Sequence, residues 1–318
     1  MRRYCVTICC CALLMAFSPI LGVESYVPSD TPPPYYDPGS HPDVAQGDID
    51  VFNFALNLEY LEAELFLWAS FGYGLDEIAP ELPGGGPSPV GVEKAQLDNF
   101  TRDVVAQLGI QEVGHLRAIR ATVTDAAISR PPLNLSVEVW AKIFDSAFGQ
   151  DLNPPFNPYV NSLNFLLASY AIPYVGLTGY VGANPNLVGR TSKRLIAGLL
   201  GVEAGQDAII RSLLYEKKDE KVTPYSYTVG DFTNALSKLR NRLDKASGID
   251  DLGLTVHAPQ TAAPGVHGSI LSADTRWVAY SRTPEQILSI VYGTGNASKP
   301  GGFYPKGGNG DIARYYLN

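Results

Sequence analysis

The stretch that decides the fold is Gln111-Glu112-Val113-Gly114-His115, which places a carboxylate and an imidazole three residues apart within a long helical pattern. Side chains at positions i and i+3 project from the same face of an α-helix. An imperfect copy of the pattern, Glu203-Ala204-Gly205-Gln206, lies in a second helical segment and has glutamine at the histidine position. Two such helices packed side by side predict a metal site between them.

Hydrophobic periodicity around these motifs predicts an all-α protein. Long helices are expected at about 48–71, 92–123, 159–180 and 187–215, with a kink at Pro173 in the third. The connection between the second and third helices is roughly 35 residues long, as an antiparallel four-helix bundle with one crossover requires. A fifth amphipathic helix is expected at about 228–246, and Thr283-Pro284-Glu285-Gln286 has the sequence of a helix start in the Gly/Pro-rich C-terminal extension.

The chain divides into four segments by composition. Residues 1–25 have the basic start and short apolar core of a secretory signal peptide, and residues 26–46 form a proline-rich leader. Residues 47–248 are expected to form the helical bundle, and residues 249–318 an extension packed on it. All four cysteines lie in the signal segment, so the mature secreted chain is expected to have no disulfide.

Charge and short motifs limit the partners. The formal net charge of −8 makes the chain a poor candidate for binding nucleic acid. Asn99, Asn134 and Asn296 begin glycosylation sequons, which are compatible with a secretory route to the cell exterior, the apoplast or the vacuole. No partner is identified by the sequence, and a homo-oligomer is compatible with it.

The third helix lies in a stretch, residues 152–189, whose only ionisable side chains are tyrosines. A membrane span is one interpretation of such a run. The stretch also contains several asparagines, serines and glycines, which favour a helix buried on most sides by neighbouring helices. We therefore expect no transmembrane span in the mature chain.

The metal-ligand set is incomplete. A di-metal centre in such a bundle takes a Glu from each of two helices and a Glu-x-x-His pair from each of the other two. The candidates are Glu59 or Glu62 on the first helix, Glu112 and His115 on the second, and Glu203 with Gln206 on the fourth. The third helix offers no acidic residue, so a standard di-iron centre cannot be assembled. A single ion remains sterically possible, with Tyr170 or Tyr174 as a candidate further oxygen ligand.

A metal-free interpretation of the same residues stays open. Buried carboxylates can be neutralised by protonation, or by hydrogen bonds to histidine, glutamine and tyrosine side chains. A buried polar network is therefore the alternative to a metal site.

Several further segments resemble the plant desiccation-related proteins that have a ferritin-like domain. The resemblance rests on the two motifs above and on residues 55–64 (ALNLEYLEAE), 281–288 (SRTPEQIL), 290–295 (IVYGTG) and 301–305 (GGFYP). These segments extend across nearly the whole mature chain. The resemblance implies a secreted ferritin-like bundle connected with dehydration stress, and in ferritin-like enzymes the motif positions would assign Glu59, Glu112, His115 and Glu203 to metal.

Two functions follow as expectations. The incomplete ligand set favours a protective stress protein that is non-catalytic or binds metal weakly. The alternative is a metal-dependent oxidase or peroxidase with a reduced, mononuclear site that holds one iron or manganese ion.

Overall fold

The computed structural model describes residues 44–245, 248–256 and 267–317. The predicted signal segment and all but the last residues of the predicted leader lie outside these ranges. In the described residues every regular element is a helix and no β-strand is present. The fold class predicted from the periodicity is thereby confirmed.

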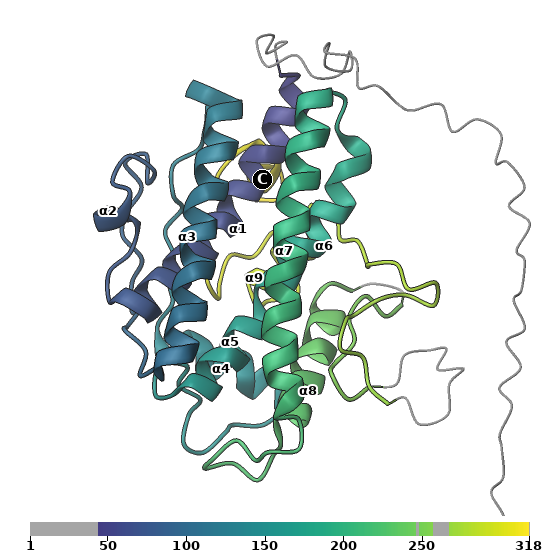
Figure 1. Cartoon of the computed structure of the whole chain (residues 1–318). Helices are drawn as coiled ribbons and strands as arrows, with labels where there is room; N and C mark the ends of the chain where they lie inside the picture. The colour runs from purple at the N-terminus through teal and green to yellow at the C-terminus, as the bar shows by residue number, and fades with distance from the viewer. Residues whose placement is uncertain (1–43, 246–247, 257–266, 318) are drawn as a thin grey trace, which may run out of the picture. The chain divides into compact units, whose positions relative to one another are not determined.

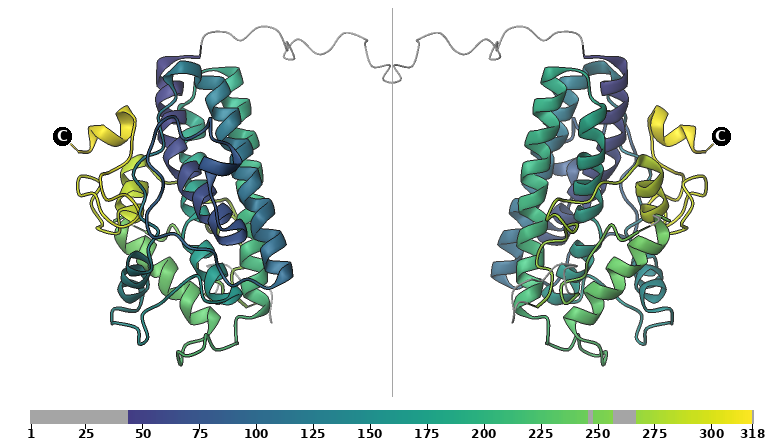
Figure 2. Two further views of the ribbon diagram at one scale, coloured as in Figure 1. Left: turned by 90° about the vertical axis from the view of Figure 1, so that its left-hand side faces the viewer. Right: turned by 90° about the vertical axis from the view of Figure 1, so that its right-hand side faces the viewer.

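Four helical rods form the bundle, and the long helices lie side by side in Figures 1 and 2. They are α1 (Gln46–Phe71), α3 (Asn99–Val123), the broken rod α5 (Ser162–Ala171) with α6 (Pro173–Ala183), and α7 (Arg190–Glu216). The crossover between α3 and α5 contains η1 (Thr124–Ala126) and α4 (Val137–Phe148), whereas only η2 (Asn184–Asn186) and a short turn separate α6 from α7. The predicted long crossover is therefore present.

Two helix starts differ from the prediction. The second rod begins at Asn99 rather than near Val92, because the carboxylate of Asp98 caps it by accepting a hydrogen bond from the Thr101 amide at 2.9 Å. A short helix that was not predicted, α2 (Leu75–Ile78), follows α1. The predicted interruption at Pro173 is present, and proline occupies the first position of α6.

Helix α1 lies at the centre of the fold. It is buried almost all round from Phe52 to Ser70, which is why its apolar residues show no single stripe. Three glutamates, Glu59, Glu62 and Glu64, are buried with it. A buried carboxylate needs a partner or a proton, so each of these three glutamates must be paired or protonated in the core.

The C-terminal extension contacts α1 and α6 directly. The Tyr304 hydroxyl donates to the backbone oxygen of Asn57 at 2.8 Å, and the Arg282 amide donates to the Thr178 oxygen at 2.9 Å. The extension carries α9 (Pro284–Val291), which begins with the predicted capping box at Thr283, and α10 (Asp311–Tyr315); α8 (Val229–Leu243) precedes it. The extension thus forms part of the surroundings of the bundle core.

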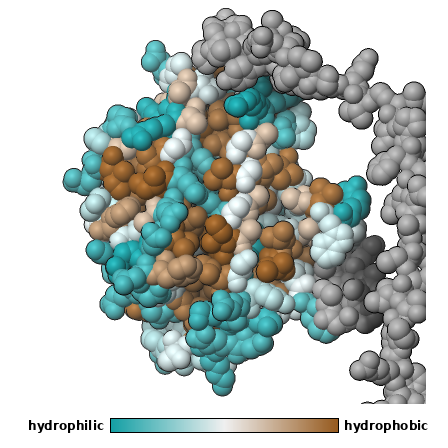
Figure 3. Space-filling view, in the orientation of Figure 1, coloured by the Kyte–Doolittle hydropathy of each residue, from teal (hydrophilic) through white to brown (hydrophobic). Residues whose placement is uncertain are grey.

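Residues Ser162–Asn186, which make up α5, α6 and η2, are long and apolar enough to cross a membrane. In the fold, 78% of the most apolar window of this segment is buried by the rest of the protein. This environment is that of a core helix, as the polar residues within it indicate. The face of the bundle drawn in Figure 3 mixes hydrophilic and hydrophobic residues. On α3 and α7, the apolar side chains of Ile110, Val202 and Ile209 are exposed.

Candidate metal centre

Three helices bring four potential metal ligands together in the bundle core. Glu59 comes from α1, Glu112 and His115 from α3, and Glu203 from α7. One ligand atom from each of the four lies within 4.8 Å of the others, and all four residues are buried. The predicted i, i+3 pair on α3 therefore faces the predicted carboxylate of α7.

His115 lies at the centre of this cluster. Its Nδ1 is 3.1 Å from Glu59 Oε2, 3.2 Å from Glu112 Oε2 and 3.4 Å from Glu203 Oε1. One nitrogen and three carboxylates thus converge on a volume small enough for one ion. This donor set suits a divalent ion such as manganese or iron.

Gln206 replaces the second histidine of the pattern and acts as a hydrogen-bond donor. Its amide nitrogen donates to Glu112 Oε1 at 2.6 Å and to Gln111 Oε1 at 3.1 Å. An amide N–H group holds a carboxylate in place but does not ligate a metal. The structure therefore places Gln206 as a support of Glu112.

The third rod offers a glycine where a ligand would be expected. A Cβ atom on Gly176 of α6 would lie 3.0 Å from Glu62 Oε1 and 3.7 Å from Glu203 Oε2. The side chain of Glu62 therefore extends toward α6, while that of Glu59 joins the cluster around His115. Glu59 and Glu62, the two candidates on α1, therefore both reach the site: Glu59 beside His115 and Glu62 beside α6.

A tyrosine that the sequence analysis did not select contacts the cluster. The Tyr180 hydroxyl of α6 donates a hydrogen bond to Glu59 Oε1. The expectation that Tyr170 or Tyr174 would add an oxygen ligand is wrong, because both rings pack against the guanidinium groups of Arg211 and Arg240. Tyr180 lies four residues after Gly176 on α6, so both residues are on the face of that helix that meets the site.

The charges in the cluster depend on one another. Burial lowers the pKa of His115, but the charge of Glu59 and hydrogen bonds to Glu112 and Glu203 raise it well above the ordinary value, so the imidazole is protonated. Burial likewise raises the pKa of Glu59, but the charge and hydrogen bond of His115 outweigh burial and leave that pKa below its ordinary value. The pair His115 and Glu59 is therefore ionic in the metal-free protein.

The other three carboxyl groups are harder to ionise. Burial, followed by repulsion from Glu203 and other carboxylates, raises the pKa of Glu62 and of Glu112 well above the usual range. Burial and the charge of Glu59 raise the pKa of Glu203 to about 7. The fold thus keeps carboxyl groups where their charges are not balanced, which is typical of functional sites.

Unpaired atoms test whether a metal fits. In the described part of the chain, Glu62 Oε2, His115 Nε2, Glu203 Oε2 and Gln206 Oε1 are buried and have no hydrogen-bond partner. Buried polar atoms in proteins are almost always paired. A cation among the carboxylates would balance their charge and use free lone pairs, so the residues present fit a metal ion.

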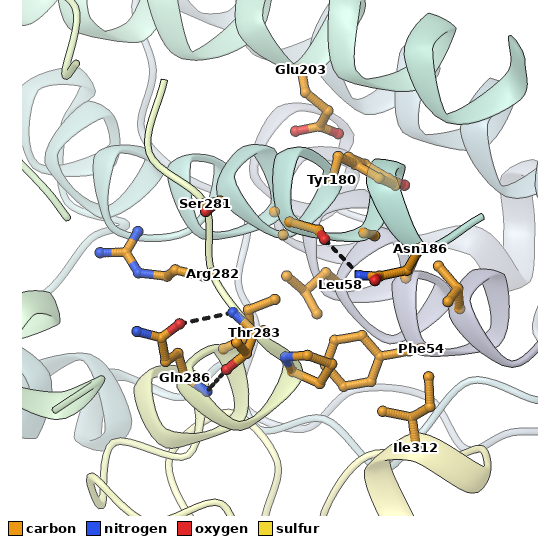
Figure 4. Close-up of a pocket in the computed structure, with 18 of the residues that line it drawn as sticks. Phe54, Leu58, Tyr180, Asn186, Glu203, Ser281, Arg282, Thr283, Gln286 and Ile312 are labelled. Atoms are coloured by element: carbon orange, nitrogen blue, oxygen red, sulfur yellow. Dashed lines mark hydrogen bonds between the residues drawn. The ribbon is translucent and has the colours of Figure 1, made fainter. Parts of the chain in front are cut away.

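A cavity lies beside this cluster, and Figure 4 shows residues that line it, among them Glu203 and Tyr180. Its volume is about 310 Å³, and Glu59, Glu62, Glu203 and Tyr180 line its inner end. The exposed residue Asn186 lines its outer end. A small molecule therefore has a route to the carboxylates.

The three sequon asparagines differ in accessibility. Asn99 and Asn296 are exposed, at the start of α3 and in a turn after α9. Asn134 is half-buried and pairs with Val90 in an isolated backbone bridge. Glycosylation of these residues stays a prediction, and the structure favours Asn99 and Asn296 over Asn134 as accessible positions.

Comparison with known proteins supports the fold and the family. The family model for the ferritin-like domain matches residues 47–216. The chain is 53% identical over 274 residues to the ferritin-like catalase Nec2 of Nesocodon mauritianus, and the aligned region covers 86% of this chain and 87% of that protein. It is 52% identical over 270 residues to the desiccation-related protein PCC13-62 of Craterostigma plantagineum, which covers 84% of this chain and 85% of that protein. No solved structure matches the chain at a significant level. The chain therefore belongs to the plant desiccation-related family of ferritin-like proteins.

Proposed function

We propose that this protein is a metal-dependent enzyme that binds one manganese or iron ion at Glu59, Glu112, His115 and Glu203 and decomposes hydrogen peroxide. The observation that carries the proposal is the buried cluster of three carboxylates and one imidazole at the inner end of an accessible cavity. The relative named as a ferritin-like catalase supports the choice of reaction. The sequence alone favoured a non-catalytic role, since neither the cavity nor the unpaired atoms can be read from it.

The reaction converts two hydrogen peroxide molecules into two water molecules and one O₂ molecule. A bound manganese or iron ion would supply the change of oxidation state. The protein residues bind the ion and handle protons. Burial and repulsion from Glu203 raise the pKa of Glu62 well above its ordinary value, and its unpaired Oε2 lies at the cavity, where it can give a proton to a peroxide oxygen and take one back.

The supporting residues hold these ligands in place. Gln206 donates to Glu112, and Tyr180 donates to Glu59, so each of these two carboxylates has one oxygen fixed by the protein. Fixed ligand orientation raises metal affinity and prevents the carboxylates from collapsing onto one another. Both residues therefore act as positioning residues.

Metal content and oxygen release test the proposal together. The mature protein is incubated with manganese or iron, desalted, and assayed by elemental analysis and with an oxygen electrode after addition of hydrogen peroxide. We expect about one ion per chain and O₂ release, and we expect Glu203→Gln to lose both. Glu216→Gln, at an exposed position of the same helix, is the matched control and should keep both. A wild-type protein without metal or O₂ release contradicts the proposal.

A non-catalytic protective role is the second candidate, and one observation favours it. The hydrogen bonds of His115, Gln206 and Tyr180 already satisfy much of the cluster from within the protein. Under this alternative the cluster is a structural polar network, and added manganese, iron or zinc should leave the thermal unfolding temperature unchanged. A rise in that temperature with metal, lost in Glu203→Gln, excludes it.

The predicted signal segment supports a further part of the proposal, which is that the protein is exported to the apoplast or the vacuole during drying. A relative named as desiccation-related agrees with this setting. N-terminal sequencing of the protein from plant tissue tests export. A start near residue 26 is expected, and a mature protein that begins at Met1 contradicts it.

A further inference from the structure

The cavity above the carboxylates is built from two parts of the chain that are far apart in sequence. One wall comes from α1 through Phe54, Ala55 and Leu58, and another from residues 281–287 of the C-terminal extension. Figure 4 shows Thr283 and Gln286 on the extension side and Phe54 on the α1 side. The extension thus shapes the space in front of the candidate metal centre.

Glycines on α6 allow this arrangement. A Cβ atom on Gly179 would lie 2.7 Å from Ile287 Cδ1, and one on Gly182 would lie 2.3 Å from the backbone oxygen of Arg282. A larger residue at Gly182 would push the backbone of the extension away from the helix, whereas one at Gly179 would displace the end of the Ile287 side chain. Gly176, further along the same face, leaves room beside Glu62 at the inner end. The backbone of α6 therefore forms the cavity wall where side chains would otherwise fill it.

The cavity is larger than hydrogen peroxide requires. A water-sized molecule occupies roughly 10–15 Å³ by the same measure, and small-molecule sites begin near 300 Å³. The cavity has about 310 Å³. Apolar side chains from three elements line its middle part, among them Leu58 of α1, Ile287 of α9 and Ile312 of α10. Such a space suits an organic molecule with an apolar body.

The charge of the inner end limits the polar group of that molecule. The acidic lining residues are Glu59, Glu62 and Glu203, and their carboxyl groups offer an anion no counter-charge. The guanidinium of Arg282 also lines the cavity, but the carboxylates of Asp244 at 3.0 Å and Asp251 at 3.8 Å already balance its charge. A neutral polar group therefore suits this end of the cavity, where the unpaired Oε2 of Glu62 can form a hydrogen bond with it.

We propose that the cavity binds neutral organic hydroperoxides, with the alkyl or aryl body against the apolar walls and the –OOH group at Glu62. This inference rests on the proposed peroxide chemistry and extends its substrate class. The O–O bond of ROOH breaks, and the products are ROH and H₂O. The two electrons and two protons come from one hydrogen peroxide molecule, which is oxidised to O₂, so that ROOH and H₂O₂ together yield ROH, H₂O and O₂.

Two variants that fill the cavity from opposite walls test the inference. Ala55 on α1 and Ala183 on α6 both line the cavity and neither is fully buried, so a phenyl ring introduced by Ala55→Phe or Ala183→Phe would occupy the space that the ligand needs. Ala121→Phe, at an exposed position of α3, is the matched control. Cumene hydroperoxide is supplied with hydrogen peroxide to the manganese-loaded protein, and 2-phenyl-2-propanol is measured by chromatography.

We expect alcohol formation that requires both peroxides, falls at least about tenfold in each cavity-filling variant and is unchanged in the control. Calorimetry with 2-phenyl-2-propanol as an unreactive probe should show binding to the wild type and not to Ala55→Phe or Ala183→Phe. O₂ release from hydrogen peroxide without alcohol formation or probe binding overturns this inference and leaves the proposed function intact. Probe binding without turnover of either peroxide overturns both.

Discussion

Replacing Glu203 by glutamine should make the metal-free protein more stable at neutral and alkaline pH. The side chain is fully buried, and burial together with the charge of Glu59 raises its pKa from 4.5 to about 7. Below pH 4.5 the carboxyl group is protonated in both the folded and the unfolded chain, so its ionisation has no effect. Between pH 4.5 and about 7 the folded protein keeps a proton that the unfolded chain releases, so the free energy of unfolding falls as pH rises.

The size of the effect follows from the same difference. A pKa raised from 4.5 to about 7 corresponds to about 3 kcal/mol of lost stability once the pH exceeds 7. Glutamine has nearly the same shape and does not ionise. The variant Glu203→Gln is therefore expected to exceed the wild type by up to about 3 kcal/mol at pH 8 and to equal it near pH 4.

Urea unfolding followed by circular dichroism measures this difference. The wild type, Glu203→Gln and the control Glu216→Gln are compared in a chelator from pH 4 to pH 8. Added manganese should reverse the order at pH 8, because only the wild type retains all four ligands. If Glu203→Gln is less stable than the wild type in the chelator at pH 8, or if the difference in the free energy of unfolding does not change with pH, then ionisation of Glu203 does not destabilise the metal-free protein.

Three further predictions concern protons, a buried ion pair and a helix cap. Metal binding should release protons, because the pKa of His115 and that of Glu112 lie well above their ordinary values and the pKa of Glu203 is about 7. Manganese affinity measured by calorimetry should therefore rise between pH 6 and pH 8, and an affinity independent of pH would contradict this. Arg130→Met should lower the free energy of unfolding in urea by about 3–5 kcal/mol, because it leaves the fully buried carboxylate of Glu64 without its ion-pair partner. Arg117→Met, which removes an exposed ion pair with Glu81, should cost less than about 1 kcal/mol. Equal effects of the two substitutions would show that burial of the ion pair does not set the cost. Asp98→Ala should cost about 1 kcal/mol through loss of the cap of α3, and since the pKa of Asp98 is lowered to about 2 by its hydrogen bonds to Ser162 and Thr101, this difference should be full above pH 4 and disappear as pH falls through about 2.

The part of the site on α3 and α7 could be predicted from the sequence. Glu112 and His115 lie on an apolar stripe of α3, and Glu203 lies on a similar stripe of α7, so helical periodicity alone directs them to the core. Each of these helices has one buried and one exposed face. A polar residue on the buried face of either helix must therefore point into the bundle core.

The contribution of α1 could not be decided in the same way. Because α1 is buried on nearly all sides, periodicity does not distinguish the face of Glu59 from that of Glu62. The structure shows that Glu59 meets His115 while Glu62 extends toward Gly176. That difference depends on which helix packs against which face of α1, and such information is in the tertiary structure.

Tyr180 and the cavity also depend on tertiary packing. Helix α6 is buried on nearly all sides from Pro173 to Thr178, so periodicity does not show which of its faces, and hence which tyrosine, meets the site. The cavity needs the extension to lie against the glycines of α6, which no local pattern predicts. The accessible cavity, which favours an enzyme over a purely protective protein, could therefore not be predicted from the sequence.

The location of a bound metal ion tests directly whether the cluster around His115 is a metal site. Crystals of the mature protein soaked in manganese and measured for anomalous scattering should show one strong peak between Glu59, Glu112, His115 and Glu203, within coordination distance of a carboxylate oxygen from α1, α3 and α7 and of the His115 ring. If crystals soaked in excess manganese show no peak among these four residues, and His115 is still paired with the three carboxylates, then the cluster does not bind a metal ion.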